Sequence, residues 1–401
     1  MSNFREDFPI FKNNPNLIYL DSTATSQKPS LVMDWLKNYL ETTYSSIHRW
    51  LYDISEKSEK LYNDSKKKVA KFIWTDSYKE IIYTYNSTYA INLLTSSIWL
   101  SKQLKKWDKV LLTEVEHNAN IIPWLILREN IWIDIEYVKL DRNYNLDLDD
   151  FKNKYDEKVK IISFTHVSNV TWQIFDLEEI WKSKRDDTIF IVDASQSIPH
   201  MQINIKKMNC DYLFFTWHKV FADTWIWVLW WKEKLLKELK PSFSWWWAIS
   251  SVGDNCFTYA KIPDKFEAWT QNISWAVSLL KAFEYIEYIW WYEVLEKYEN
   301  ELVEYFLDKL KKYKNIKLIW SNDSKNRLWV FSMVIEWFHS NDVADLLADN
   351  NIAVRSWKHC AHSFFDNIWI KHSFRVSLYI YNTKDDIDSF FNIIIKILNN
   401  K

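Results

Sequence analysis

Hydrophobic and polar residues alternate along the first two thirds of the chain with two different periods. Short apolar runs rich in β-formers predict strands near 80–84, 109–113, 133–138, 159–164, 188–192, 211–215 and 226–230. Amphipathic segments near 88–104, 120–130 and 177–184 predict helices between several of these strands. Such alternation is typical of an α/β domain with a largely parallel sheet.

The pattern changes near residue 272. From about 272 to 314 the apolar positions follow a helical period, which predicts a long helical connector. Beyond it, strands near 330–336 and 374–378 flank a helix at 340–349, and a helix at 383–399 follows. We expect a large domain over 21–285 and a small α+β domain formed by 1–20 and 286–401. Ligands of such sheets bind beyond the carboxyl ends of the strands.

Composition and charge narrow the class of protein. The 401 residues include 51 Lys and Arg against 53 Asp and Glu, a formal net charge of −2, so nucleic acid is not an expected partner. The first residues lack the features of a signal peptide, and no stretch approaches the ~18 apolar residues of a membrane span. We therefore expect a cytoplasmic protein without a membrane partner. Cys210, Cys256 and Cys360 are too few and too scattered for a disulfide framework or a four-cysteine metal site.

Glycine and tryptophan usage is abnormal. The chain has 1 Gly and 26 Trp, and several Trp stand at turn-like places, among them Trp107, Trp357 and the triplet 245–247. Some bacteria read the codon UGA as glycine where a related code reads it as tryptophan. We hypothesise that most of these Trp are Gly in the natural polypeptide. The other interpretation is a chain that is truly rich in Trp, with a large exposed apolar surface.

Three segments beside predicted strand ends carry candidate chemistry. Lys219 follows the strand near 211–215, and a lysine on a constrained turn in a site can form a Schiff base, although a lone loop lysine is usually a solvated charge. Asp193 ends the strand near 188–192 and could pair with a protonated ring nitrogen, or it could simply cap a loop. The segment 86–88 offers hydroxyls and free N–H groups at the start of a helix, where a phosphate could bind, and it also reads as an ordinary N-cap.

With these residues in place, the chain resembles the group II cysteine desulfurases of the SUF sulfur-mobilisation type, which belong to the class V aminotransferases. The resemblance extends over nearly the whole chain. It is carried by YLDSTA at 19–24, HRW at 48–50, EVEHNANIIPW at 114–124, THVSNVTW at 165–172, IVDASQ at 191–196, TWHK at 216–219, FEAWTQN at 266–272, RSWKHCA at 355–361 and RVSLYIYNT at 375–383. In this family Trp50, Trp172, Trp217, Trp225, Trp227, Trp269 and Trp357 are expected to be Gly, whereas Trp124 is a true tryptophan. Trp35 and Trp230 stay undecided.

The resemblance implies the aspartate-aminotransferase-like fold (fold type I), with a mostly parallel seven-stranded sheet and a smaller α+β domain. It also implies pyridoxal 5'-phosphate (PLP) as cofactor. Lys219 would hold PLP covalently, His117 would stack on its ring, Asp193 would bind the ring nitrogen and Gln196 the phenolic oxygen. The phosphate would be held by Ser87, Thr88, Thr216, His218 and, from the other subunit of a homodimer, Thr270.

For the substrate, the resemblance implies that Arg375 grips the carboxylate of L-cysteine, with Arg355, Asn169 and His48 nearby. Cys360 would take the sulfur as a persulfide, leaving L-alanine, and pass it to an acceptor protein of the SUF type for iron–sulfur cluster assembly. We expect Arg355 and Lys358, and His359 when charged, to favour the Cys360 thiolate. His359, Cys360 and His362 could also be read as metal ligands, but no second cluster accompanies them and we expect no metal.

Several positions depart from the family pattern. Tyr85 replaces a common Arg, Tyr89 replaces a common Glu, and Ala222-Asp223 replaces a Gly-Pro or Ala-Pro pair. Only one histidine follows Glu116, and His362-Ser363 stands where a Gln-Pro pair is frequent. These departures leave the cofactor assignments intact. They make the way in which the Cys360 loop meets its acceptor protein an open question.

Two other functions remain open at this point. A selenocysteine lyase, or another PLP lyase or aminotransferase, would keep the fold and change the chemistry. A chain truly rich in Trp could instead be a catalytically inactive scaffold or binding protein.

Overall fold

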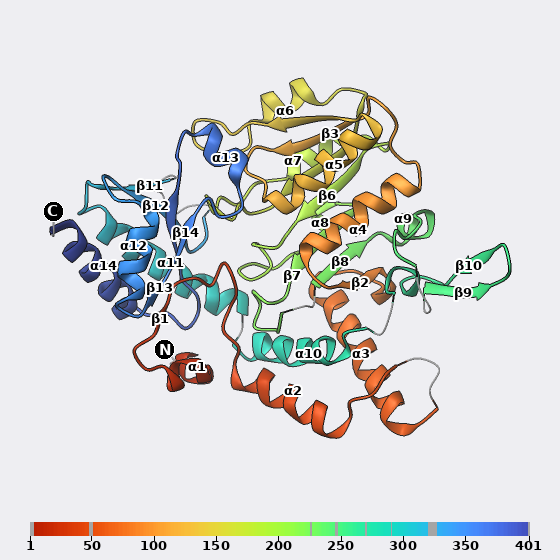
Figure 1. Ribbon diagram of the computed structural model, residues 1–401, viewed down its shortest axis with the longest axis horizontal. Coiled ribbons are helices and arrows are strands. Elements are labelled where there is room, and N and C mark those ends of the chain that lie inside the picture. The colour runs from red at the N-terminus through yellow and green to blue at the C-terminus, as the bar shows by residue number, and fades with distance from the viewer. Residues whose placement is uncertain are drawn as a thin grey trace.

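The computed structural model describes residues 4–47, 51–224, 227–244, 248–268, 271–289, 291–319 and 327–399. A seven-stranded sheet forms its centre (Figure 1). The strand order is β2 (Ile81–Thr84), β8 (Trp227–Trp231), β7 (Tyr212–Thr216), β6 (Ile189–Asp193), β5 (Val159–Thr165), β3 (Lys109–Thr113) and β4 (Asp134–Val138). From β7 to β4 neighbouring strands are parallel, whereas β8 is antiparallel to both β7 and β2. The predicted mostly parallel α/β sheet is confirmed.

Alternate residues of each strand pack on opposite faces of this sheet, as the pleat requires. On one face Ile191 and Phe214 belong to a core shared with α4 (Ser87–Leu100) and α5 (Ile122–Ile131). On the other face Val192 and Phe215 belong to a larger core that continues into α10 (Ile273–Tyr288). The remaining helices of this region are short: α6 (Leu148–Lys154), α7 (Glu178–Ser183), α8 (Ile205–Met208) and α9 (Glu233–Glu238).

The helical stretch predicted from about 272 to 314 is divided. Two helices occupy it, α10 and α11 (Trp291–Leu310), and α10 packs against α2 (Ser30–Thr42) and α3 (Asp53–Phe72) instead of leaving the large sheet at once. A hairpin of β9 (Ile249–Val252) and β10 (Phe257–Tyr259) projects from the side of the molecule opposite to the chain ends (Figure 1).

A second, antiparallel sheet forms beyond α11. Its order is β11 (Ile316–Leu318), β12 (Val330–Ile335), β15 (Ser373–Ser377) and β14 (Arg355–Trp357), with α12 (Ser340–Ala348), α13 (His362–Asn367) and α14 (Lys384–Asn399) beside it. The N-terminal segment joins this unit: α1 (Pro9–Asn13) precedes β1 (Ile18–Tyr19), which pairs in parallel with β13 (Ile352–Ala353), and Arg5 Nη1 lies 3.2 Å from Asp386 Oδ2.

Within the described ranges, no helix is both long and apolar enough to cross a membrane.

Candidate active site

A cavity of about 220 Å³ lies where β5, β6 and β7 end in Thr165, Asp193 and Thr216. Each described residue that the sequence assigned to the site lines this cavity. They are Ser87, Thr88, His117, Asn169, Asp193, Gln196, Thr216, His218, Lys219, Arg355, Cys360 and Arg375. His48 and Thr270 lie outside the described residues. Thr165, Asp193 and Thr216 line the cavity from the large sheet, and Arg355 and Arg375 line it from β14 and β15 of the small sheet. The cavity therefore lies between the two sheets.

The amine of Lys219 is prepared to lose its proton. Burial lowers the pKa of Lys219 to about 7; Asp193 opposes this effect, while the positive charges of Arg375 and Arg355 add to it. An uncharged amine can attack a carbonyl carbon and can accept a proton, so Lys219 has the properties of both a Schiff-base lysine and a general base.

Hydrogen bonds hold the turn that carries Lys219 in place, and the sequence did not predict the residues that form them. The carbonyl oxygen of His218 accepts hydrogen bonds from Thr25 Oγ1 at 3.0 Å, Ser26 N at 3.0 Å and Lys28 Nζ at 2.9 Å. The carbonyl oxygen of Lys219 accepts one from the Tyr379 hydroxyl at 3.0 Å. The only hint of these contacts in the sequence was the polar run at 25–28 after β1. This run shows neither a helical nor a strand period, so it predicted no structure.

Asp193 lies at the end of β6 with its carboxylate enclosed. Its Oδ1 accepts a hydrogen bond from Ser195 N at 2.9 Å, and burial raises the pKa of Asp193. A buried acid with free acceptor capacity can hold a protonated ring nitrogen.

The first turn of α4 borders the cavity at Ser87 and Thr88. Asn86 is the N-cap, because its Oδ1 accepts a hydrogen bond from Tyr89 N at 2.6 Å. The Ser87 hydroxyl lies 3.2 Å from that of Ser195. The N-terminus of this 14-residue helix has N–H groups without partners inside the helix and carries a partial positive charge. Both favour binding of an anion.

His117 has a neutral ring. Burial, followed by the charge of Lys219, lowers the pKa of His117 to about 4, and its Nδ1 accepts a hydrogen bond from Ala119 N at 3.1 Å. An uncharged imidazole suits stacking on an aromatic cofactor ring.

Cys360 lies on an exposed loop whose backbone is unusual. His359 and Cys360 both have positive φ, 48° and 59°, in the left-handed region that side chains disfavour. Asn169 Nδ2 donates to the His359 carbonyl at 2.5 Å, and Asn118 N donates to the Cys360 carbonyl at 2.7 Å. The loop thus brings Cys360 to the same cavity as Lys219.

The surroundings of Cys360 correct two expectations. Burial and the two nearby arginines hold the pKa of His359 well below its usual range, and its Nε2 lies 2.8 Å from Ser373 Oγ, so His359 is neutral and not a cationic neighbour. Lys358 forms an ion pair with Asp366 at 2.5 Å and does not line the cavity. Arg355 and Arg375 are the arginines that do.

Arg375 is buried at 2% exposure and can meet a carboxylate. Its Nη2 lies 3.2 Å from Asp21 Oδ1, and its Nη1 donates to the Asn169 carbonyl at 3.2 Å. Within the described part of the chain, its Nε has no hydrogen-bond partner. Burial lowers the pKa of Arg375 to about 10, so the guanidinium keeps its charge at neutral pH.

The Trp217 indole does not occupy the space beside Thr216 and His218 in the cavity. Its ring packs in the core against Phe72, Phe215 and Phe283, and it does not line the cavity.

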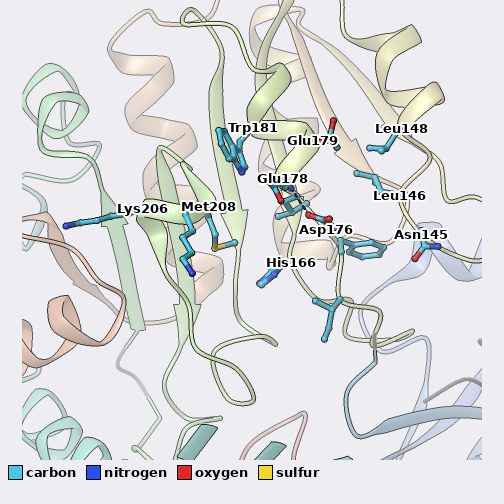
Figure 2. Close-up of a pocket in the computed structure, with 14 residues that line it drawn as sticks. Asn145, Leu146, Leu148, His166, Asp176, Glu178, Glu179, Trp181, Lys206 and Met208 are labelled. Carbon is cyan, nitrogen blue, oxygen red and sulfur yellow. Dashed lines mark hydrogen bonds between the residues drawn. The ribbon is translucent and has the colours of Figure 1, made fainter. Parts of the chain in front are cut away.

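A larger cleft of about 770 Å³ is lined by residues of α7 and α8 (Figure 2). His166 lines it while Thr165 faces the smaller cavity, because successive strand residues point to opposite faces. Two charged residues that line it form ion pairs, Lys206 with Asp76 at 2.7 Å and Glu178 with Lys182 at 2.6 Å. Among the described residues that line this cleft there is no cysteine beside the lysines.

The residues of the smaller cavity fit PLP. Among the described residues, Gln196 Oε1 and Thr216 Oγ1 are buried without a hydrogen-bond partner, which leaves them available to a polar ligand. Lys219, Asp193 and the α4 N-terminus supply the amine, the acid and the anion site that this cofactor requires.

Comparisons with known proteins agree with this geometry. The sequence pattern of the family described as "Aminotransferase class-V" matches residues 18–390. A probable cysteine desulfurase of Synechocystis sp. is 36% identical over 394 residues, 96% of this chain and 93% of that protein. A cysteine desulfurase of Wigglesworthia glossinidia brevipalpis is 34% identical over 402 residues, 98% of this chain and 96% of that protein.

Among solved structures, the apo cysteine desulfurase of Thermococcus onnurineus NA1 superposes with a TM-score of 0.93 at 30% identity. The match covers 99% of this chain and 98% of that one.

Proposed function

The chain belongs to the aminotransferase class-V family, and on this premise we propose that it is a PLP-dependent cysteine desulfurase that converts L-cysteine to L-alanine and keeps the sulfur on Cys360. The observation that carries the proposal is the single cavity lined by Lys219, Cys360 and Arg375. An aminotransferase needs the lysine and the arginine, but only sulfur chemistry gives the cysteine a role.

When bound, PLP supplies an aldehyde for the substrate amine and a ring that withdraws electrons from the substrate. Lys219 would hold the cofactor and, with its pKa lowered to about 7, could accept the substrate α-proton. Asp193 would pair with the ring nitrogen, His117 would stack on the ring and Gln196 would contact the phenolic oxygen. Asn169 would contact the cofactor and substrate region. Ser87, Thr88, Thr216 and His218 would hold the phosphate, joined by Thr270 from a second subunit.

Arg375 orients the substrate through its carboxylate, with Arg355, Asn169 and His48 near it. The Cys360 thiolate then attacks the substrate sulfur. A sulfur–sulfur bond forms on Cys360 as the bond between the substrate Cβ and its sulfur breaks. The electron pair of the broken bond stays with the carbon, which takes up a proton and leaves as L-alanine.

The finer assignment rests on the motif resemblance. We propose a group II enzyme of the SUF type, cytoplasmic and homodimeric, which passes its sulfur to a SUF-type acceptor protein. The chain would divide into a PLP-binding domain over 21–285 and a small domain of 1–20 and 286–401. Pairing of β1 with β13 supports placing the N-terminal segment with the small domain.

Backbone geometry supports the recoding hypothesis. The described residues include fourteen non-glycine residues with positive φ, and seven of them are Trp. They are Trp74, Trp107, Trp132, Trp172, Trp337, Trp357 and Trp369. Glycine enters this region without the cost that a bulky side chain incurs. We propose that these seven positions, and most other Trp positions, are glycine in the natural polypeptide.

Three tryptophans are not among these positive-φ positions. Trp124 lies in helix α5, and its side chain is buried in the core. Trp230 Nε1 donates to Glu80 at 3.0 Å, and the Lys281 amine lies 4.6 Å from the Trp35 ring centroid. We propose that Trp124 is a true tryptophan, and these contacts are compatible with one at 35 and 230.

Product analysis tests the proposed function. Natural protein incubated with L-cysteine should form alanine and, with a reductant, sulfide, and Cys360→Ala should lose this activity. Alanine formed only from L-selenocysteine, or equal cysteine turnover by Cys360→Ala, would favour a selenocysteine lyase. Borohydride reduction followed by peptide mapping should place a pyridoxyl group on Lys219, and its absence from fresh protein would favour a scaffold.

A further inference from the structure

Asn118 bridges the residue that covers the cofactor and the loop that carries the nucleophile. Its backbone N–H donates to the Cys360 carbonyl at 2.7 Å. Its side-chain Nδ2 lies 2.8 Å from His362 Nδ1, and its Oδ1 accepts a hydrogen bond from His362 N at 3.3 Å. Asn118 therefore contacts the loop on both sides of Ala361, from a position next to His117.

The segment that carries Asn118 is a firm support. The preceding carboxylate, Glu116, is fully buried and accepts hydrogen bonds from Thr113 Oγ1 at 2.7 Å, Thr165 N at 2.7 Å and Asn120 Nδ2 at 2.8 Å. The bond from Thr165 ties this segment to the end of β5, and the bond from Thr113 ties it to the end of β3. A group held by Asn118 is consequently fixed relative to the large sheet.

The strained backbone of the Cys360 loop has to be stabilised by contacts with its neighbours. Two consecutive left-handed residues, His359 and Cys360, cost about 1–2 kcal/mol each and persist only where neighbours impose them. Asn169 and Ser373 restrain the His359 side of the loop. On the Cys360 side, Asn118 supplies hydrogen bonds from the large domain to the loop.

The two partners are also two of the positions where this chain departs from its family pattern. By the motif resemblance, a second histidine would be expected after His117, where this chain has Asn118. A Gln-Pro pair is frequent where this chain has His362-Ser363. The structure brings these two departures into contact.

We infer that Asn118 and His362 form a latch that sets the position of Cys360 for its attack on the substrate sulfur. Asn118 is a positioning residue in this reaction, because it acts through the Cys360 loop and does not touch the reacting atoms. The inference rests on the proposed function. It identifies the contact between Asn118 and His362 as what positions Cys360 for the attack on the substrate sulfur.

Reciprocal exchange tests the latch. In the natural protein, Asn118→His and His362→Gln should each lower kcat for alanine formation by about three- to tenfold, the effect of one hydrogen bond, with KM unchanged. The double variant should recover most of the loss. Asn118→Ala and His362→Ala should lose similar amounts, and their combination no more than either alone. Asn130→Ala, an exposed helix asparagine, is the matched control.

Hydrogen exchange of the backbone amides of 357–363 gives a readout independent of turnover. It should quicken in Asn118→Ala and His362→Ala and return to wild-type rates in the exchanged double variant. Additive losses, no recovery in the double variant, or unchanged exchange would overturn the latch. If the wild type makes no alanine from cysteine while exchange responds as expected, the proposed function fails and the loop contact stands.

Discussion

Arg375 Nη2 lies 3.2 Å from Asp21 Oδ1, and this ion pair joins β15 to the turn that follows β1. Asp21 balances part of the guanidinium charge, and Nε stays without a partner in the described part of the chain. The pair orients the fork of Arg375 toward the cavity that also holds Lys219 and Cys360. The proposed role of Arg375 in binding the substrate carboxylate therefore requires a cation that this ion pair already holds in position.

Arg375→Lys should impair recognition of that carboxylate. A lysine keeps the charge but lacks the planar fork, so kcat/KM for L-cysteine should fall by about ten- to a hundredfold, mostly through KM. Steady-state alanine formation measures this effect. The exposed Arg128→Lys is the matched control, and an equal loss in both variants would contradict the assignment.

The lowered pKa of Lys219 should appear in the assembly of the holoenzyme. Only the uncharged amine attacks an aldehyde, so the rate at which apoenzyme takes up PLP should rise as pH increases through about 7 and then level off. An ordinary lysine would give a rate that keeps rising toward about pH 10. Stopped-flow absorbance across this range distinguishes the two profiles.

The same shift predicts a stability effect. Between about pH 7 and the ordinary value of 10.5, the unfolded chain holds a proton that folded Lys219 has lost. The free energy of unfolding of the apoenzyme should therefore rise with pH over this window, and Lys219→Met should remove that part of the rise. An identical pH dependence in the variant would contradict the shift.

Loss of a buried ion pair beside the edge strand β2 should destabilise the fold. Lys66 Nζ lies 2.7 Å from Glu267 Oε1, and both side chains are 2% exposed. Lys66→Met should lower the free energy of unfolding by about 3–5 kcal/mol, because it leaves the Glu267 charge buried without its cation. Lys67→Met breaks an exposed pair with Asp64 and should cost less than about 1 kcal/mol. Urea unfolding of both variants tests this difference, and similar costs would refute it.

The recoding hypothesis predicts a lighter natural protein. Every Trp replaced by Gly reduces the intact mass, and peptides that cover 172, 357 and 369 should contain glycine while the peptide that covers 124 keeps its tryptophan. Mass spectrometry of protein purified from its native source measures both. An intact mass equal to that of the printed sequence would refute the hypothesis.

Much of the fold could be predicted because its strands are buried on both faces. Runs such as 110–112 and 189–192 are continuously apolar, and this signal is local. β14 was missed because its three residues, 355–357, are polar or exposed and become a strand only by pairing with β15. The break between α10 and α11 was also missed, since both helices follow the same apolar period.

Sequence reasoning located the candidate site through motifs but missed its supports. Lys28 and His218 are 190 positions apart, and Asn118 and His362 are 244 apart. Nothing local in either segment indicates the other, because such contacts arise only when segments that are distant in the chain fold against each other. The neutral state of His359 could not be predicted either, since it follows from burial and from its bond to Ser373.

The central claim is that Cys360 receives the sulfur, and the mass of its peptide tests this most directly. After a single turnover with L-cysteine and no reductant, the peptide that contains Cys360 should be heavier by one sulfur atom. The exposed Cys256 and the buried Cys210 are internal controls and should stay unchanged. Alanine formed in stoichiometric amount while the Cys360 peptide keeps its original mass would contradict the account.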